Sequence, residues 1–176
     1  MEDFLVEQKR SNQKIPNLEI YTDGSLKRSG QNMTFGGWSF LALRGGEFIY
    51  EASGSEYGTT NQRMELIAIR NALEFAAANR QMNENVTIYS DSAYAVNCYN
   101  QRWYERWQTN GWVNSKNESV ANQDLWEQIV PYFDNFWYHF SKVKGHDENY
   151  WNNEADRLAQ EEAQSLKDGW QGEEYE

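Results

Sequence analysis

Alternating apolar and polar residues in the first third of the chain predict three strands. The alternation runs through residues 18–25, resumes in the apolar run 35–43, and continues over 47–54 after a glycine turn. β-Branched and aromatic residues favour an extended backbone, and glycine favours the turns between such segments. We expect the first strand to end abruptly at Asp23, and the glycine pair at 36–37 to mark a bulge or a place of close packing.

The clearest helix is predicted over residues 60–78. Its apolar side chains recur every three or four residues, at Met64, Leu66, Ala68, Ile69, Leu73, Phe75 and Ala76. Thr59 can cap this helix, with Gln62 completing a capping box. Glu65 lies on the inward half of the helix, where an unpaired carboxylate is costly. It therefore needs a cation or hydrogen-bond donors, unless it is only a first-turn acid that favours the helix dipole.

The rest of the chain adds two more strands and further helices. We expect a strand at 86–91, a helix from about Ser92, a polar and aromatic segment at 100–126, a helix at 119–133, a strand at 136–143 and a final helix at about 150–166. Polar loops are expected at 27–32 and 144–149. The predicted order of elements is therefore β-β-β-α-β-α-α-α-β-α.

Length and composition indicate one packed domain. The chain has 176 residues, of which 39% are hydrophobic and 15% aromatic, and eight are tryptophan. This is enough for a single domain with a real core, and it argues against disorder. We expect a mobile N-terminal arm at 1–17, one folded domain at 18–166 and an acidic C-terminal tail at 167–176.

Net charge and cysteine content bear on the partners and the compartment. The net charge is −11, so the overall field of the protein does not attract nucleic acid. Cys98 is the sole cysteine, which excludes an intrachain disulfide and suits a reducing compartment. No apolar run approaches the length of a membrane span, and acids stand where a signal peptide would be basic. We expect a cytoplasmic monomer that does not contact a membrane.

Two aspartates follow very similar apolar runs. Asp23 ends Ile-Tyr-Thr-Asp, and Asp91 ends Ile-Tyr-Ser-Asp. Sites in open α/β sheets form outside the carboxyl ends of the strands, so the two carboxylates would face each other if these strands are parallel neighbours. Two close carboxylates repel unless a proton or a cation lies between them. The alternative is two unrelated aspartates in turns, where this residue is common.

Four acids are candidate metal ligands: Asp23, Glu65, Asp91 and Asp156. Asp156 lies beside small apolar residues of the last helix, although periodicity alone does not distinguish it from Glu154. Hard oxygen ligands without cysteine suit Mg²⁺ or Mn²⁺ rather than zinc. Paired magnesium ions stabilise both the attacking and the leaving oxygens in phosphodiester hydrolysis.

Four blocks of sequence carry a resemblance to a known family. They are Tyr-Thr-Asp-Gly-Ser at 21–25, Thr-Thr-Asn-Gln-Arg-Met-Glu-Leu at 59–66, Tyr-Ser-Asp-Ser at 89–92, and Lys-Gly-His at 144–146 followed by Asn-Glu-Ala-Asp-Arg-Leu-Ala at 153–159. Over about residues 18–160 the chain resembles type 1 (bacterial-type) ribonuclease H, the enzymes that cut the RNA strand of an RNA–DNA hybrid. The resemblance implies an α/β, ribonuclease H-like fold, with a five-stranded mixed sheet flanked by helices on both faces.

The resemblance also implies a catalytic set. The matching carboxylates bind two Mg²⁺ ions, which Mn²⁺ can replace, and they are Asp23, Glu65, Asp91 and Asp156. Asp23 would lie between both ions. His146 matches a histidine that helps to move protons or to release product, a role that suits a side chain titrating near neutrality. Water would attack the phosphorus and leave 3′-hydroxyl and 5′-phosphate ends. His139 is expected to point from a strand without a catalytic role.

Residues for binding the RNA–DNA hybrid duplex are implied in the same way. Asn61 and Gln62 match a pair that touches the minor groove, where 2′-hydroxyls distinguish RNA from DNA. The family usually has asparagine at the second position, so Gln62 keeps the amide on a longer side chain. Gly24 lets the backbone approach the bound strand closely.

One region departs from the family. Many bacterial members carry a basic protrusion that grips the DNA strand, but residues 100–126 of this chain contain three basic and three acidic residues and have no net charge. Trp103 matches a position that can meet the DNA, and Arg102 and Arg106 could partly replace the missing cations. We expect most tryptophans of this region to pack in the core.

Two other functions compete with cleavage of hybrids. A nuclease of the same fold could act on DNA junctions or ends, although the pair Asn61 and Gln62 argues against it. A binding module without catalysis could keep the fold, but it would be free to lose the acids, and this chain keeps all four.

Overall fold

A five-stranded mixed sheet is the centre of the computed structural model, which describes residues 17–30, 32–143 and 149–171. The order of strands is β3-β2-β1-β4-β5. β1 (Asn17–Arg28) pairs antiparallel with β2 (Thr34–Arg44), which pairs antiparallel with β3 (Glu47–Tyr57). On its other side β1 pairs parallel with β4 (Asn85–Ser90), and β4 with β5 (Tyr138–Lys142). The α/β fold class with a five-stranded mixed sheet is confirmed.

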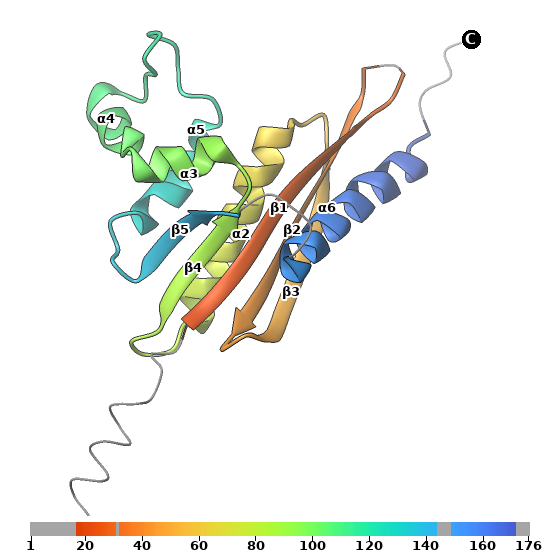
Figure 1. The fold of residues 1–176 in the computed structure, drawn as a ribbon. Helices are drawn as coiled ribbons and strands as arrows, with labels where there is room; N and C mark the ends of the chain where they lie inside the picture. The colour runs from red at the N-terminus through yellow and green to blue at the C-terminus, as the bar shows by residue number, and fades with distance from the viewer. Residues whose placement is uncertain (1–16, 31, 144–148, 172–176) are drawn as a thin grey trace, which may run out of the picture.

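Helices cover both faces of this sheet (Figure 1). One face carries α2 (Asn61–Asn79), α3 (Ala93–Asn100), α4 (Trp103–Asn110), α5 (Gln123–Ile129) and the short 3₁₀ helix η1 (Val130–Tyr132). The other face is covered by α6 (Tyr150–Gly169). The predicted order of strands and helices is the observed one. Within the described part of the chain, no helix combines the length and the apolar character that crossing a membrane requires.

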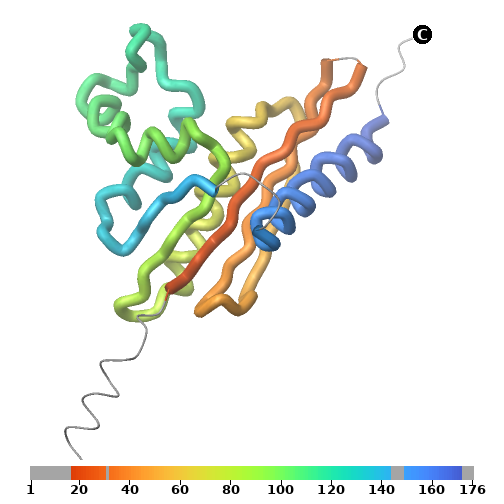
Figure 2. The backbone as a smooth tube through the Cα atoms, in the orientation of Figure 1, coloured from red at the N-terminus to blue at the C-terminus, as the bar shows by residue number. Residues whose placement is uncertain are grey.

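Alternating side chains of β1 feed two apolar cores. Leu18 and Ile20 point into the larger core under α2, whereas Tyr21 points into the smaller core under α6. The larger core continues to α5, where Trp126 has no exposed surface. Each large apolar side chain buried in this way contributes roughly 1.5–3 kcal/mol. Figure 2 shows β1 in red, running between β2 and β4 through the middle of the molecule.

The glycine pair of β2 allows close packing on both faces of the sheet. A side chain at Gly36 would collide with Thr59 and Met64, and one at Gly37 would collide with the backbone of Ala159. Of the two alternatives for this pair, close packing is therefore the observed one. The bulge of the β2–β3 ladder lies further along, where Ile49 is the additional residue.

The first strand does not end at Asp23, so that prediction was wrong. β1 continues to Arg28 because β2 keeps pairing with it as far as Thr34, and residues 27 and 28 belong to the strand rather than to a loop. Only the ladder with β4 stops early, at the pair Tyr21 and Tyr89. Asp23 therefore lies just past the end of the parallel ladder, within a strand that continues.

Several element boundaries also differ from the predicted ones. Thr60, not Thr59, caps α2, and it accepts a hydrogen bond from the backbone N–H of Arg63. The helix predicted at 119–133 and the strand predicted at 136–143 are both shorter, as α5 and β5. α6 is longer and reaches Gly169, so that residues 167–169 of the expected tail are helical. Asn17, assigned to the arm, is the first residue of β1. The rest of the expected arm, the end of the tail and most of the loop expected at 144–149 lie outside the described residues.

Candidate active site

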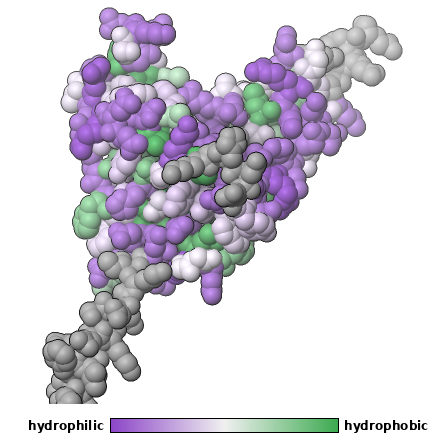
Figure 3. Space-filling model, in the orientation of Figure 1, coloured by the Kyte–Doolittle hydropathy of each residue, from purple (hydrophilic) through white to green (hydrophobic). Residues whose placement is uncertain are grey.

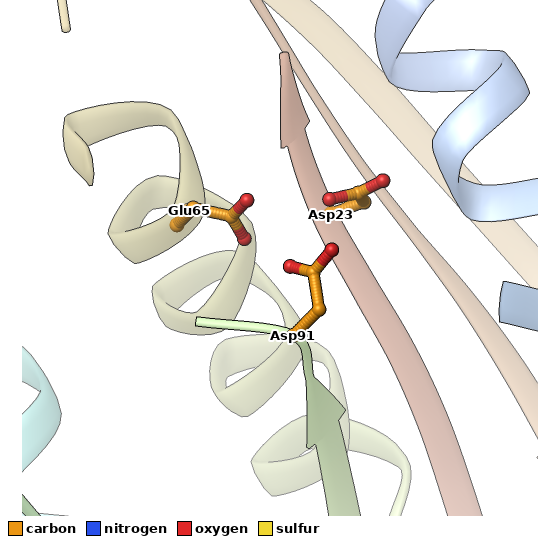
Figure 4. Close-up of side chains that lie close together, drawn as sticks. All are labelled: Asp23, Glu65 and Asp91. Atoms are coloured by element: carbon orange, nitrogen blue, oxygen red, sulfur yellow. The ribbon is translucent and has the colours of Figure 1, made fainter. Parts of the chain in front are cut away.

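Two aspartates meet where the parallel ladder of β1 and β4 stops. β4 ends at Ser90, and Asp91 follows it directly. Asp23 lies in β1, two residues after Tyr21, which is the last residue of β1 that pairs with β4. Because parallel strands bring their carboxyl ends to the same edge, both side chains reach the same space, as Figure 4 shows. The expectation that Asp23 and Asp91 face each other is confirmed.

Glu65 reaches this pair from α2, because Gly24 leaves room for the helix. A Cβ atom on Gly24 would lie 2.5 Å from the backbone nitrogen of Glu65 and 2.8 Å from the carbonyl carbon of Met64. The helix backbone therefore rests on the backbone of β1, and the Glu65 side chain extends beside Asp23. Glu65 is 5% exposed, which confirms the prediction that it faces inward.

The three carboxylates form a tight group. One oxygen of each of Asp23, Glu65 and Asp91 lies within 4.8 Å of the others. Asp23 is 3% exposed, while Asp91 is open to solvent. The group is thus buried on the side of the sheet and open on the side of Asp91.

Burial and mutual repulsion disfavour the charged forms of this group. Burial, and then the neighbouring Asp91, raises the pKa of Asp23 to about 8, against one opposing hydrogen bond of 2.9 Å from the backbone N–H of Gly24. Burial, followed by Asp23 and Asp91, raises the pKa of Glu65 well above its ordinary value. Its Oε2 atom is buried and has no hydrogen-bond partner. Among the described residues, no lysine or arginine forms an ion pair with these three acids.

A hard divalent cation fits this donor set. All donors are carboxylate oxygens, one of them buried without a partner, and their charges repel when no cation is present. Carboxylate oxygens are the ligands that Mg²⁺ and Mn²⁺ prefer. The arrangement is consistent with divalent metal binding, in agreement with the expectation from sequence.

The fourth acid, Asp156, lies at the wall of the same pocket. This pocket has a volume of about 350 Å³, and its lining also includes Asn61, Gln62, Gly24 and Ser92. Asp156 is not one of the three tightly grouped acids, although its presence nearby contributes to the raised pKa of Asp23. The structure also distinguishes it from Glu154, which pairs instead with Arg157 at 2.8 Å.

Ser92 is the pocket residue that we did not select from the sequence. It was expected only as the cap of a helix, and its hydroxyl does cap α3 by accepting from the backbone N–H of Ala95. Its position next to Asp91 was the available signal, because the residue after a strand-end ligand shares the same edge of the sheet.

The remaining expected binding residues lie in a second cavity, beside α4. It has a volume of about 650 Å³ and is lined by Arg102, Trp103 and Arg106, together with Tyr94, Trp107 and Lys116. Arg102 is paired with Glu105, and the indole N–H of Trp103 donates to Gln101 at 3.0 Å. The two cavities are neighbours, since Ser92 lines one and Tyr94, two residues further along, lines the other.

The remaining expectations concern the tryptophans of residues 100–126 and the two histidines. Trp107 and Trp126 are buried in the core, as expected, whereas Trp103 and Trp112 are half-buried. His139 is exposed on β5. His146 lies outside the described residues, and its role stays a prediction.

Comparison with solved structures identifies the fold. The chain superposes on the solution structure of the PFV RNase H domain with a TM-score of 0.72 at 21% identity, covering 86% of this chain and 97% of that one. It superposes on the foamy viral protease-reverse transcriptase in complex with RNA/DNA hybrid with a TM-score of 0.74 at 22% identity, covering 84% of this chain and 20% of that one. The fold is thus the α/β ribonuclease H-like fold.

Sequence comparison identifies the family. The RNase H family model matches residues 16–164. The protein named Ribonuclease H from Syntrophomonas wolfei subsp. wolfei is 46% identical over 147 residues, which are 84% of this chain and 96% of that protein. The chain belongs to the RNase H family and is an enzyme of the ribonuclease H class.

Proposed function

We propose that this enzyme hydrolyses the RNA strand of RNA–DNA hybrids. The observation that carries the proposal is one pocket that contains both the carboxylate group and the amide pair, with Asp23, Glu65 and Asp91 beside Asn61 and Gln62. Its membership of the RNase H family supports the same substrate. The foamy viral protease-reverse transcriptase, which was solved in complex with RNA/DNA hybrid, supports it as well, although the likeness to that protein concerns the fold alone.

The metal requirement follows from the carboxylates. Asp23, Glu65 and Asp91 would hold Mg²⁺, and Asp156 would complete the set from α6. When bound, two such ions would stabilise the attacking and leaving oxygens of the phosphodiester, and hydrolysis would leave 3′-hydroxyl and 5′-phosphate ends. The role of the protein is to hold the four acids close together, and burial makes the charged forms of Asp23 and Glu65 unfavourable without cations.

Recognition of the RNA strand is assigned to the rim of the pocket. Asn61 is exposed and Gln62 half-buried, at the first turn of α2, so that their amides are available to a bound strand. Amide groups can both donate to and accept from a 2′-hydroxyl, which DNA lacks. Gly24 lines the same pocket, and its lack of a side chain already serves the contact between β1 and α2.

The cavity beside α4 is the proposed contact for the DNA strand. Trp103 offers a half-buried aromatic surface, and stacking on such surfaces tolerates any base. Arg106 and Lys116 line the cavity without an ion pair to any described residue, whereas Glu105 neutralises Arg102. The available positive charge is therefore small, and it is carried by Arg106 and Lys116 more than by Arg102.

Matched substrates test this proposal. Duplexes of one sequence, as RNA–DNA hybrid, DNA and RNA, are incubated with the protein in Mg²⁺ and in EDTA. We expect cleavage of the RNA strand of the hybrid alone, and only with the metal ion. Cleavage of the DNA duplex would favour a nuclease for DNA junctions or ends, and tight binding of hybrid without cleavage would favour a binding module. The mobility and end-labelling of the products show which end carries the phosphate.

A further inference from the structure

Arg63, in α2, connects this helix to the end of β3 and to the start of α5. It lies in the first turn of α2, between Gln62 and Glu65 of the carboxylate pocket. Its Nη2 and Nη1 atoms lie 2.9 and 3.2 Å from the two carboxylate oxygens of Asp124, and Nη1 lies 3.4 Å from Oδ1 of Asn122. Its Nε atom faces Oε2 of Glu56, at the end of β3, at 3.5 Å. The guanidinium thus joins α2 to the end of β3, which precedes it closely in sequence, and to the start of α5, which is distant in sequence.

Arg63 donates to side-chain oxygens at the start of α5 and lies beside a buried carboxylate oxygen of β3. Asn122 begins α5 in a left-handed conformation with φ of 57° and makes no side-chain cap, so its side-chain oxygen is free for Arg63. Oε2 of Glu56 is buried and has no hydrogen bond. The hydrogen bonds from Arg63 hold the pKa of Asp124 below its ordinary value. A planar guanidinium suits such a set of acceptors, whereas a lysine ammonium cannot reproduce its fixed, forked geometry.

The helix that Arg63 holds also supports the second cavity. Trp126 of α5 packs edge-on against Trp107 at 5.4 Å and against Tyr94 at 5.8 Å between ring centroids. Both of these partners line the cavity beside α4. α5 thus links α2, which lines the carboxylate pocket, to two side chains that line this cavity.

We propose that Arg63 is a positioning residue that sets the spacing between the carboxylate pocket and the α4 cavity, so that one hybrid duplex can occupy both at once. The inference rests on the proposed function, because it takes the duplex as the ligand of both cavities. Two contacts on one rigid frame bind a long duplex more tightly than either alone, and this advantage is lost when their geometry no longer matches.

The test compares hybrids of two lengths. The short hybrid has about 3 base pairs closed by a hairpin loop and spans roughly 10 Å, so that it contacts one cavity at a time, whereas about 18 base pairs, roughly 60 Å, cover both cavities. Binding of uncleavable hybrids is measured in Ca²⁺, and the ratio of the two dissociation constants is the length advantage. We expect Arg63→Ala to reduce this advantage by roughly fivefold or more, with less than about a twofold change for the short hybrid. In Mg²⁺, the Michaelis constant for the long hybrid should rise more than the maximal rate falls.

Two controls separate positioning from general damage. Arg70→Ala removes another arginine of α2 that faces α5, at 3.4 Å from Gln128, but two turns away from the pocket, and it should leave the length advantage unchanged. Asp124→Asn removes the main partner of Arg63 and should reproduce the loss, and the double variant should be no worse than either single one. If Arg63→Ala does not fold, as shown by thermal melting, Asp124→Asn carries the test.

The inference is wrong if Arg63→Ala or Asp124→Asn weakens both hybrids equally, or neither. It is also wrong if Arg70→Ala has the same effect. Failure of the proposed function has a different signature, since the wild-type protein would then neither cleave nor bind hybrids of either length in preference to DNA.

Discussion

Replacing Asp23 by asparagine should abolish cleavage and at the same time stabilise the metal-free protein. Asp23 is buried beside Glu65 and Asp91, and its folded-state pKa is raised to about 8. Asparagine has nearly the same shape, and its oxygen can still accept the hydrogen bond from the N–H of Gly24. The variant therefore removes a charge from the carboxylate group without opening a cavity.

The raised pKa determines the size and the pH range of this stabilisation. The folded chain holds the Asp23 proton more tightly than the unfolded chain, so this group favours folding most below about pH 4, and the contribution is lost as the pH rises toward about 8. A pKa of about 8 against an unfolded value of 3.8 corresponds to a loss of about 4 kcal/mol by pH 7. For a chain of this size, each kcal/mol changes Tm by about 2–4 °C, so the variant should melt about 10 °C higher at pH 7.

Thermal melting in EDTA between about pH 4 and about pH 8 measures this difference. The Tm of Asp23→Asn should exceed that of the wild-type protein by an amount that is small at the acid end and grows with pH. Added Mg²⁺ should raise the Tm of the wild-type protein more than that of the variant, because a cation relieves the same repulsion. Asp134→Asn, at an exposed acid that does not line the pocket, is the matched control and should show no such trend.

A constant Tm difference across this pH range would refute the electrostatic reasoning. Cleavage by Asp23→Asn at near the wild-type rate in Mg²⁺ would refute the assignment of Asp23 as a metal ligand. The two results are independent, because melting is measured without the metal ion.

Three further predictions concern catalysis, binding and packing. His146→Ala should slow turnover by about 10²–10⁴-fold without eliminating it; single-turnover rates as low as those of Asp23→Asn, or equal to wild type, would contradict the proton-handling role. Arg102→Ala combined with Arg106→Ala should raise the Michaelis constant more than it lowers the maximal rate. Hybrid binding by the wild-type protein should depend weakly on salt, because log affinity falls with log salt by roughly 0.9 per phosphate contact and few such contacts are available. A steep slope in a salt series measured in Ca²⁺ would reveal a larger positive surface. Gly24→Ala should lower Tm by several degrees, because its Cβ would lie 2.5 Å from the backbone nitrogen of Glu65; an unchanged Tm would show that the helix can move away.

The exposed surface supports the prediction that hybrid binding depends weakly on salt. The face drawn in Figure 3 is mostly hydrophilic, and acidic residues outnumber basic ones by 27 to 16 over the whole chain. A strongly basic duplex-binding face is therefore not expected, and under the proposed function hybrid binding would depend on the carboxylate pocket and on a few cations and aromatic side chains.

Periodicity in the sequence was sufficient to predict the order of strands and helices and the inward position of Glu65. Side chains that repeat every three or four residues can pack on only one side of a helix, so the burial of Glu65 follows from its neighbours in sequence. The repeated run before Asp23 and Asp91 predicted two similar strands in the same way, and their parallel pairing then brought the two acids together. These features depend on local spacing, which the sequence records directly.

The tertiary structure decided what depends on a partner distant in sequence. β1 continues past Asp23 because β2 lies beside it, and no property of residues 24–28 alone predicts this. Asp156 rather than Glu154 lines the pocket because of the way in which α6 packs on β1 and β2, which local sequence does not determine. Arg63 finds its acceptors in Asn122 and Asp124 only after the chain has folded, since hydrogen bonds and ion pairs act over a few ångströms of space and not along the sequence.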